Sequence, residues 1–199
     1  MAIFHDPGAE GSAETERDAD TADPLARLGP PRAAAGVPIV DMPVSVPSGW
    51  NDPATGTDGP RYWDRIISSE GARVRRYKRP ATVVLAEIAG LARLGRQWGP
   101  DVAERTLFVA ARTLSKELRT SDHIARIEPF RFGVLLTETT EIAAINFVER
   151  ARAACERDLL VASEIVAVAF GWASPPPKRD LADAVTIAER RLQAELDEL

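Results

Sequence analysis

Short strand-forming runs alternate with helical patterns from about Asp52 to the end of the chain, and this alternation restricts the fold more than any other feature. The run 82–88 is apolar and rich in strand-forming residues, which is typical of a buried central strand. Two further runs, 123–127 and 132–136, lie close enough together in the sequence to predict a β-hairpin. A fourth strand is expected over 165–172.

Four segments between and beside these runs carry apolar residues at helical spacing. Helices are expected over 62–78, which ends before Pro80, and over 103–118. Two later helices are each expected to turn one face toward the core. The residues predicted on those faces are Ile142, Ile145, Val148 and Cys155 for the third helix, and Leu181, Val185, Ala188 and Leu192 for the fourth. Helices interleaved with strands, plus one hairpin, predict an α/β or α+β sandwich in which helices cover a single sheet.

The first 51 residues differ from the rest and are expected to be a disordered tail. Proline, alanine, glycine and acidic residues dominate as far as Arg32, so this part buries too little apolar surface to offset its ordering entropy. The segment 37–47 is apolar and is kept extended by its prolines. It is either a stiff linker or a short docking segment for the sheet edge or groove of an unidentified protein partner. The remaining residues, 52–199, are expected to form the domain.

Composition excludes several classes of partner and location. The net charge of −5 does not favour nucleic acid or an anionic membrane surface. The run 73–79 is strongly basic, but only Tyr77 offers an aromatic platform there, so nucleic-acid binding is not expected. The single cysteine, Cys155, cannot form an internal disulfide and indicates a reducing compartment. Without a signal sequence or an apolar stretch of about 18 residues, the chain is expected to be cytoplasmic.

Five short segments resemble, in order and spacing, the signatures of the GGDEF domain family of diguanylate cyclases. They are DPATGTDGPRYW at 52–63, EIAGLA at 87–92, GPDVAE at 99–104, RIEPFRF at 126–132 and FGWA at 170–173. The resemblance covers nearly the whole globular part of the chain. It implies a nucleotidyl-cyclase-like palm, with a central, mostly antiparallel sheet flanked by helices and one hairpin at the altered signature.

Catalysis in this family, as the resemblance implies, needs two divalent metal ions held by carboxylates. One ligand position is Glu87, which is still acidic, and the other is Phe130, which has no oxygen to offer. Glu128 and Pro129 replace the paired glycines that let the backbone approach the nucleotide. The altered positions of the former active site are Glu87, Ala92, Gly95, Glu104, Glu128, Pro129, Phe130 and Arg131. From these residues we expect no metal site, no cofactor and no cyclase activity.

The resemblance also implies a product-binding site that this chain keeps. Arg119 and Asp122 stand where active members often carry an R-x-x-D motif, and Arg150 matches a second arginine. An arginine can donate two hydrogen bonds to O6 and N7 of guanine, and a carboxylate can accept from the opposite edge of the base. The alternative is that Arg119 and Asp122 form an ordinary ion pair worth about 0.2–0.5 kcal/mol, or that Asp122 only ends a helix. Arg150 is then simply a solvated side chain.

Two functions are predicted from these residues. The first is a non-catalytic effector that binds cyclic di-GMP at Arg119, Asp122 and Arg150, relays the level of this second messenger to a protein partner, and dimerises through the ligand. The alternative is a ligand-independent interaction scaffold that kept only the fold. A third hypothesis is GTP binding without turnover where Glu87 and Glu104 remain, although a negative Glu128 beside the phosphates argues against it.

Overall fold

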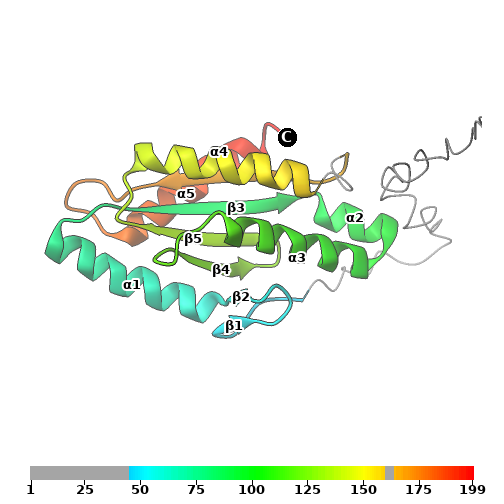
Figure 1. Cartoon of the computed structure of the whole chain (residues 1–199), viewed down its shortest axis with the longest axis horizontal. Coiled ribbons are helices and arrows are strands. Elements are labelled where there is room, and N and C mark those ends of the chain that lie inside the picture. The colour runs from blue at the N-terminus through cyan, green and yellow to red at the C-terminus, as the bar shows by residue number, and fades with distance from the viewer. Residues whose placement is uncertain (1–44, 160–163) are drawn as a thin grey trace, which may run out of the picture.

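The computed structural model describes residues 45–159 and 164–199. Within these residues one sheet has the strand order β1-β2-β4-β5-β3-β6 (Figure 1). The strands are β1 (Asn51–Asp52), β2 (Thr57–Asp58), β3 (Ala81–Ala89), β4 (His123–Glu128), β5 (Arg131–Thr137) and β6 (Ala167–Ala173). The helices are α1 (Pro60–Tyr77), α2 (Leu91–Trp98), α3 (Pro100–Lys116), α4 (Glu141–Asp158) and α5 (Leu181–Leu196).

The central strand is β3, which pairs antiparallel with β5 on one side and with β6 on the other. Its residues 83–86 are completely buried, as the apolar run predicted. Strands β4 and β5 form the expected hairpin, with Pro129 and Phe130 at its turn. Because only the short contact of β2 with β4 is parallel, the predicted α+β fold with a mostly antiparallel sheet is confirmed.

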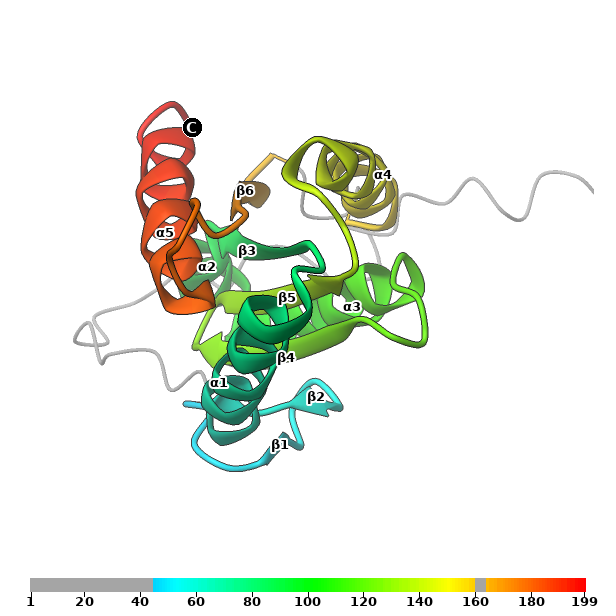
Figure 2. The same ribbon diagram turned by 90° about the vertical axis from the view of Figure 1, so that its left-hand side faces the viewer.

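Helices cover both faces of this sheet (Figures 1 and 2). On one face, α2, α3 and α4 enclose a core that includes Leu107, Phe132 and Phe170. On the other face, α1 and α5 enclose a second core that includes Trp63 and Leu181. Each face of the sheet therefore has its own hydrophobic cluster, and the sheet is the middle layer of three.

The α4 helix buries a different face from the one that the sequence predicted. Ile142 and Ile145 are 80% and 38% exposed, so their prediction as core residues is wrong. The buried residues of α4 are Ala144, Phe147, Val148, Ala151, Ala154 and Cys155. Alanines are common on the buried face because α4 lies close to the sheet and to α3. The sequence of α4 has apolar residues on two faces of the helix, so periodicity alone did not show which face is buried. The segment Leu91–Trp98, which was not predicted as a helix, forms α2.

The described chain begins before the expected domain boundary. Ser45 contacts the hairpin, and Pro47 is buried. Residues 37–44 of the predicted docking segment lie outside the described residues, as does the rest of the predicted tail up to that point. Among the helices that the structure describes, none has the length and apolar character needed to cross a membrane.

Candidate functional site

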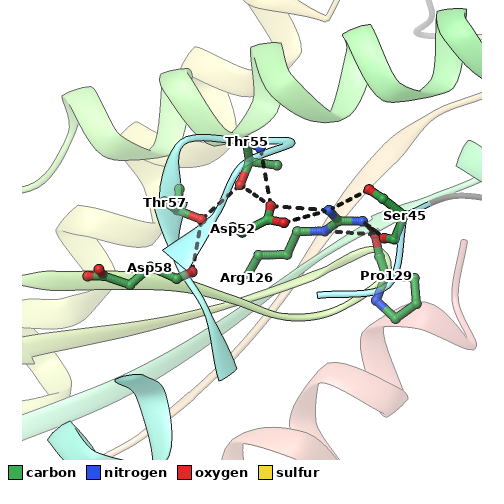
Figure 3. A network of polar contacts seen from close by, with 7 residues as sticks. All are labelled: Ser45, Asp52, Thr55, Thr57, Asp58, Arg126 and Pro129. Atoms are coloured by element: carbon green, nitrogen blue, oxygen red, sulfur yellow. Dashed lines mark hydrogen bonds and ion pairs between the residues drawn. The ribbon is translucent and has the colours of Figure 1, made fainter. Parts of the chain in front are cut away.

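A buried arginine donates hydrogen bonds to the turn of the β4–β5 hairpin (Figure 3). Arg126 on β4 is 0% exposed, and its Nη1 lies 3.1 Å from Oδ2 of Asp52, which is also buried. Its Nη2 donates to the carbonyl oxygens of Ser45 at 2.5 Å and of Pro129 at 2.9 Å. Asp52 also accepts from the hydroxyl of Thr55 at 2.5 Å. The network joins the hairpin turn to the start of the described chain.

Arg131 bridges the two carboxylates of the altered signature. Its Nε and Nη2 lie 2.9 Å and 2.6 Å from Oε2 of Glu87, and its Nη1 lies 3.0 Å from Oε1 of Glu128. Arg131 and Glu87 are both about four-fifths buried, so water screens this pair only in part. The negative charge of the Glu87 carboxylate is therefore balanced by the Arg131 guanidinium.

The other positions that the sequence analysis assigned to the cyclase signature lie at the hairpin turn, on α2 and on α3. Phe130 at the hairpin turn packs against the core under α3 and α4, and its backbone carbonyl accepts from the amide of Ile88 at 2.9 Å. Ala92 and Gly95 lie on α2, and Glu104 is exposed on α3. At the two positions that the resemblance assigns to metal ligands, the structure places Glu87, paired with Arg131, and the hydrocarbon ring of Phe130.

The Arg119 to Asp122 turn connects α3 to β4. The Asp122 carboxylate accepts from the backbone amide of Arg119 at 3.1 Å and from the backbone amide of Thr137 at 3.2 Å. Asp122 thereby fixes the turn against the end of β5. Among the ion pairs of the described residues, none joins the Arg119 guanidinium to Asp122, and Arg119 is exposed.

Arg119 lines a groove of about 740 Å³ between this turn and the C-terminal end of α1. We call this surface the Arg119 groove and define it by its charged and aromatic residues together with His123. These are Glu70, Arg73, Tyr77, Arg79, Arg119, His123 and Glu138. Arg73 and Arg79 pair with Glu70 and Glu138, and Tyr77 is 57% exposed. The basic run on α1 was noted in the sequence, but only the packing of α1 brings it beside Arg119.

His123 lines the groove and bonds to a side chain of α1. Its Nδ1 lies 2.9 Å from the hydroxyl of Tyr62 on α1. Burial and the nearby Asp58 carboxylate both raise the pKa of Tyr62, so this hydroxyl stays neutral. The hydrogen bond joins α1 to β4.

Arg150, the third predicted ligand residue, does not line the groove. It lies exposed on α4, where its Nε is 3.2 Å from Oε2 of Glu117 and its Nη1 donates to the carbonyl of Asn146 at 3.1 Å. Because Glu117 is two residues before Arg119, this ion pair connects Arg150 to the chain segment that carries Arg119. The structure thus groups Arg119 with the basic end of α1 more directly than with Arg150.

This fold is that of a known class of protein. Residues 50–198 match the family model described as "Diguanylate cyclase, GGDEF domain", and the chain belongs to this family. It is similar to the probable diguanylate cyclase DgcC of Escherichia coli strain K12, with 30% identity over 99 residues, and to DgcT of the same strain, with 27% identity over 106 residues. These alignments cover 50% and 53% of this chain but 27% and 23% of the relatives, so the matched part is about a quarter of their length.

Solved structures agree on the fold. The GGDEF domain of FimX from Pseudomonas aeruginosa aligns with a TM-score of 0.69 at 17% identity, covering 76% of this chain and 96% of that one. The GGDEF domain of DgcB from Caulobacter crescentus, in complex with c-di-GMP, gives 0.68 at 13%, covering 76% and 92%. SiaD from P. aeruginosa, in complex with its activator SiaC, gives 0.66 at 21%, covering 74% and 58%.

The comparisons contradict one prediction from the sequence. We expected that the chain is not an enzyme, because residues of the cyclase signature are replaced. The family model that covers the globular part is described as a diguanylate cyclase domain, and the relatives DgcC, DgcT and DosC are all named as diguanylate cyclases. The expectation is therefore corrected, and the chain is placed in a family of enzymes.

Proposed function

We propose that this GGDEF domain binds cyclic di-GMP in the Arg119 groove and relays occupancy of the groove to a protein partner. The observation that carries the proposal is the position of Arg119. Its side chain enters a groove that also receives Arg73, Arg79 and the exposed ring of Tyr77. The groove volume of about 740 Å³ lies within the range of small-molecule sites, roughly 300–1,000 Å³.

The chemistry of these side chains suits a guanine dinucleotide. Arg119 can donate two parallel hydrogen bonds to O6 and N7 of a guanine. Tyr77 offers a flat face on which a base can stack. Arg73 and Arg79 each pair with one carboxylate, but a guanidinium carries five N–H donors, so both retain donors for the phosphates.

Asp122 and Arg150 have supporting roles in this proposal. Asp122 holds the backbone of Arg119, and its two oxygens keep lone pairs that can accept from the N1–H and amino group of guanine. Arg150 supplies a second cation from α4 once its guanidinium turns away from Glu117. In the family, such a site often takes two stacked ligands that bridge two domains, so a ligand-induced homodimer is part of the proposal.

Two neighbours support the proposal by analogy. The DgcB domain is described in complex with c-di-GMP, and SiaD in complex with a protein activator. A ligand-responsive domain that contacts a protein partner is therefore consistent with the fold. The alternative, an interaction scaffold that does not respond to the ligand, predicts no effect of cyclic di-GMP.

The test is titration calorimetry of the full chain with cyclic di-GMP. We expect Arg119→Ala to weaken binding by about 1–3 kcal/mol, or roughly 5- to 150-fold, because one bidentate base contact is lost. The matched control is Arg105→Ala on α3, which removes the same charge from an exposed position outside the groove.

Thermal unfolding supplies an independent measurement. A ligand that binds only the native state raises the apparent melting temperature as its concentration increases. Wild-type protein and Arg105→Ala should show this shift, and Arg119→Ala should need a higher ligand concentration for it. Binding that Arg119→Ala leaves unchanged would refute the groove, and no binding by the wild type would favour the scaffold.

A further inference from the structure

The β6 strand leaves one edge of the sheet open. In the described part of the chain β6 pairs only with β3, so its other side faces outward (Figure 2). An unpaired strand edge presents backbone amides and carbonyls that can pair with another chain. The outward groups belong to alternate residues, because neighbouring residues of a strand point their backbone groups to opposite sides.

Side chains from α4 and α5 occupy this edge at regular intervals. We call them the edge ladder. In order along β6 they are Arg152 on the carbonyl of Val168, Glu195 on the amide of Phe170, Arg191 on the carbonyl of Trp172 and Glu141 on the amide of Ser174. The first, second and fourth contacts are 3.2, 3.2 and 2.9 Å long.

The ladder residues also pair with each other. Arg152 lies 2.7 Å from Glu195, and Arg191 lies 2.7 Å from Glu141. Burial alone would raise the pKa of Glu141, but the Ser174 amide and Arg191 outweigh it and hold that pKa below its ordinary value. Along β6 the ladder residues follow the order basic, acidic, basic, acidic.

This order is self-complementary under two-fold symmetry. When a second copy of β6 lies antiparallel, Phe170 faces Trp172 of the copy, and Val168 faces Ser174 of the copy. Arg152 then faces a second Glu141, and Glu195 faces a second Arg191. A parallel arrangement in the same register would place like charges together, which is unfavourable. Closed two-fold dimers require this kind of surface, in which the same patch serves both copies.

Apolar side chains border the ladder on the α4 side. Ile142 and Ile145 on α4, which the sequence predicted for the core, are exposed beside the half-buried ring of Trp172. They line a groove of about 790 Å³ together with the ladder residues Glu141, Arg191 and Glu195. Exposed apolar side chains with polar residues beside them often mark a surface that another protein covers.

We propose that the β6 edge is a dimer interface, in which a second copy of this chain lies antiparallel along β6 with Gly171 on the two-fold axis. Each ladder residue then exchanges its partner within the chain for the opposite charge on the second copy, and Ile142 and Ile145 become buried. This interface shares no lining residue with the Arg119 groove, whose strand residues belong to β3, β4 and β5, so it does not require a ligand.

Sedimentation velocity of the full chain tests the proposal, over about 1–100 μM, which brackets a micromolar dissociation constant. The wild type should show a reversible monomer–dimer equilibrium. The double variant Arg152→Glu with Arg191→Glu makes the ladder wholly acidic, and Glu141→Arg with Glu195→Arg makes it wholly basic. Each should be monomeric alone, and their equimolar mixture should recover the dimer, because every position again faces an opposite charge.

Two controls keep the result interpretable. Arg93→Glu with Arg105→Glu makes the same charge change at exposed positions on α2 and α3, and it should dimerise like the wild type. Ile142→Asp changes a side chain that is 80% exposed, so it should fold normally and weaken the dimer by about tenfold or more, because burial of an unpaired carboxylate is costly.

Three outcomes overturn the proposal. If the wild type stays monomeric at every concentration, the β6 edge is not an interface between two copies of this chain. A dimer that persists in Ile142→Asp and in both ladder variants uses another face. Folded ladder variants that fail to associate when mixed show that charge order does not govern the contact.

Discussion

Replacement of Arg126 with methionine is expected to lower the free energy of unfolding by about 3–5 kcal/mol, the usual cost of breaking a buried ion pair. Arg126 is 0% exposed and Asp52 3% exposed, so the variant leaves a buried carboxylate without its counter-charge. The carbonyls of Ser45 and Pro129 lose their donor at the same time. Urea unfolding followed by tryptophan fluorescence measures the change.

The double variant Arg126→Met with Asp52→Leu separates the two causes of this loss. When both charges are removed, no uncompensated ion remains, and part of the stability should return. The control Arg93→Met removes an exposed arginine and should change stability by less than about 0.5 kcal/mol. An Arg126→Met variant as stable as this control would mean that the buried pair contributes nothing to the domain.

Substitution of Gly171 by alanine is expected to cost about 1–3 kcal/mol or more, because β6 and α5 are packed too closely for a methyl group. A Cβ at this position would lie 2.1 Å from the carbonyl oxygen of Ala188 and 2.4 Å from the amide nitrogen of Leu192. Both contacts are with the helix backbone, so α5 itself must move away from the sheet. Calorimetric unfolding measures the cost.

Gly133→Ala is the matched comparison. Its Cβ would meet ring atoms of Trp63 at 2.9 Å, which are side-chain atoms, so the ring can shift without moving a helix. We expect a smaller loss than for Gly171→Ala. Equal losses would indicate that the ring of Trp63 is as fixed as the backbone of α5, and no loss at Gly171 would contradict the close packing of α5.

The β4–β5 hairpin was predicted from the sequence, but the contacts of its side chains were not. The sequence located the hairpin correctly, because a hairpin follows from the short spacing of two strands. The positions of the cyclase signature that the resemblance marks as replaced stay a prediction. The expectation that the chain is not an enzyme inferred the activity of the whole domain from a few positions. The family comparison contradicts this expectation. The bridge from Arg131 to Glu87 and Glu128 was not predicted, since it depends on how the turn places three side chains.

The candidate ligand site was predicted only in part. Arg119 and Asp122 were chosen by their spacing, which is local. The rest of the Arg119 groove was not predicted, because Arg73 and Tyr77 are more than 40 residues away in the sequence. Their proximity results from the packing of α1 beside β4, which the hydrogen bond from Tyr62 to His123 supports.

The sequence by itself determined strands β3 to β6, most helices, the hairpin and the family, because each depends on periodicity or short spacing within one segment. The tertiary structure alone decided which face of α4 is buried, which charges meet at the edge of β6, and that Arg126 pairs with Asp52. These contacts join residues up to 81 positions apart, as from Ser45 to Arg126. Such pairs are selected by the packing of whole elements against the sheet, and no local pattern in the chain specifies them.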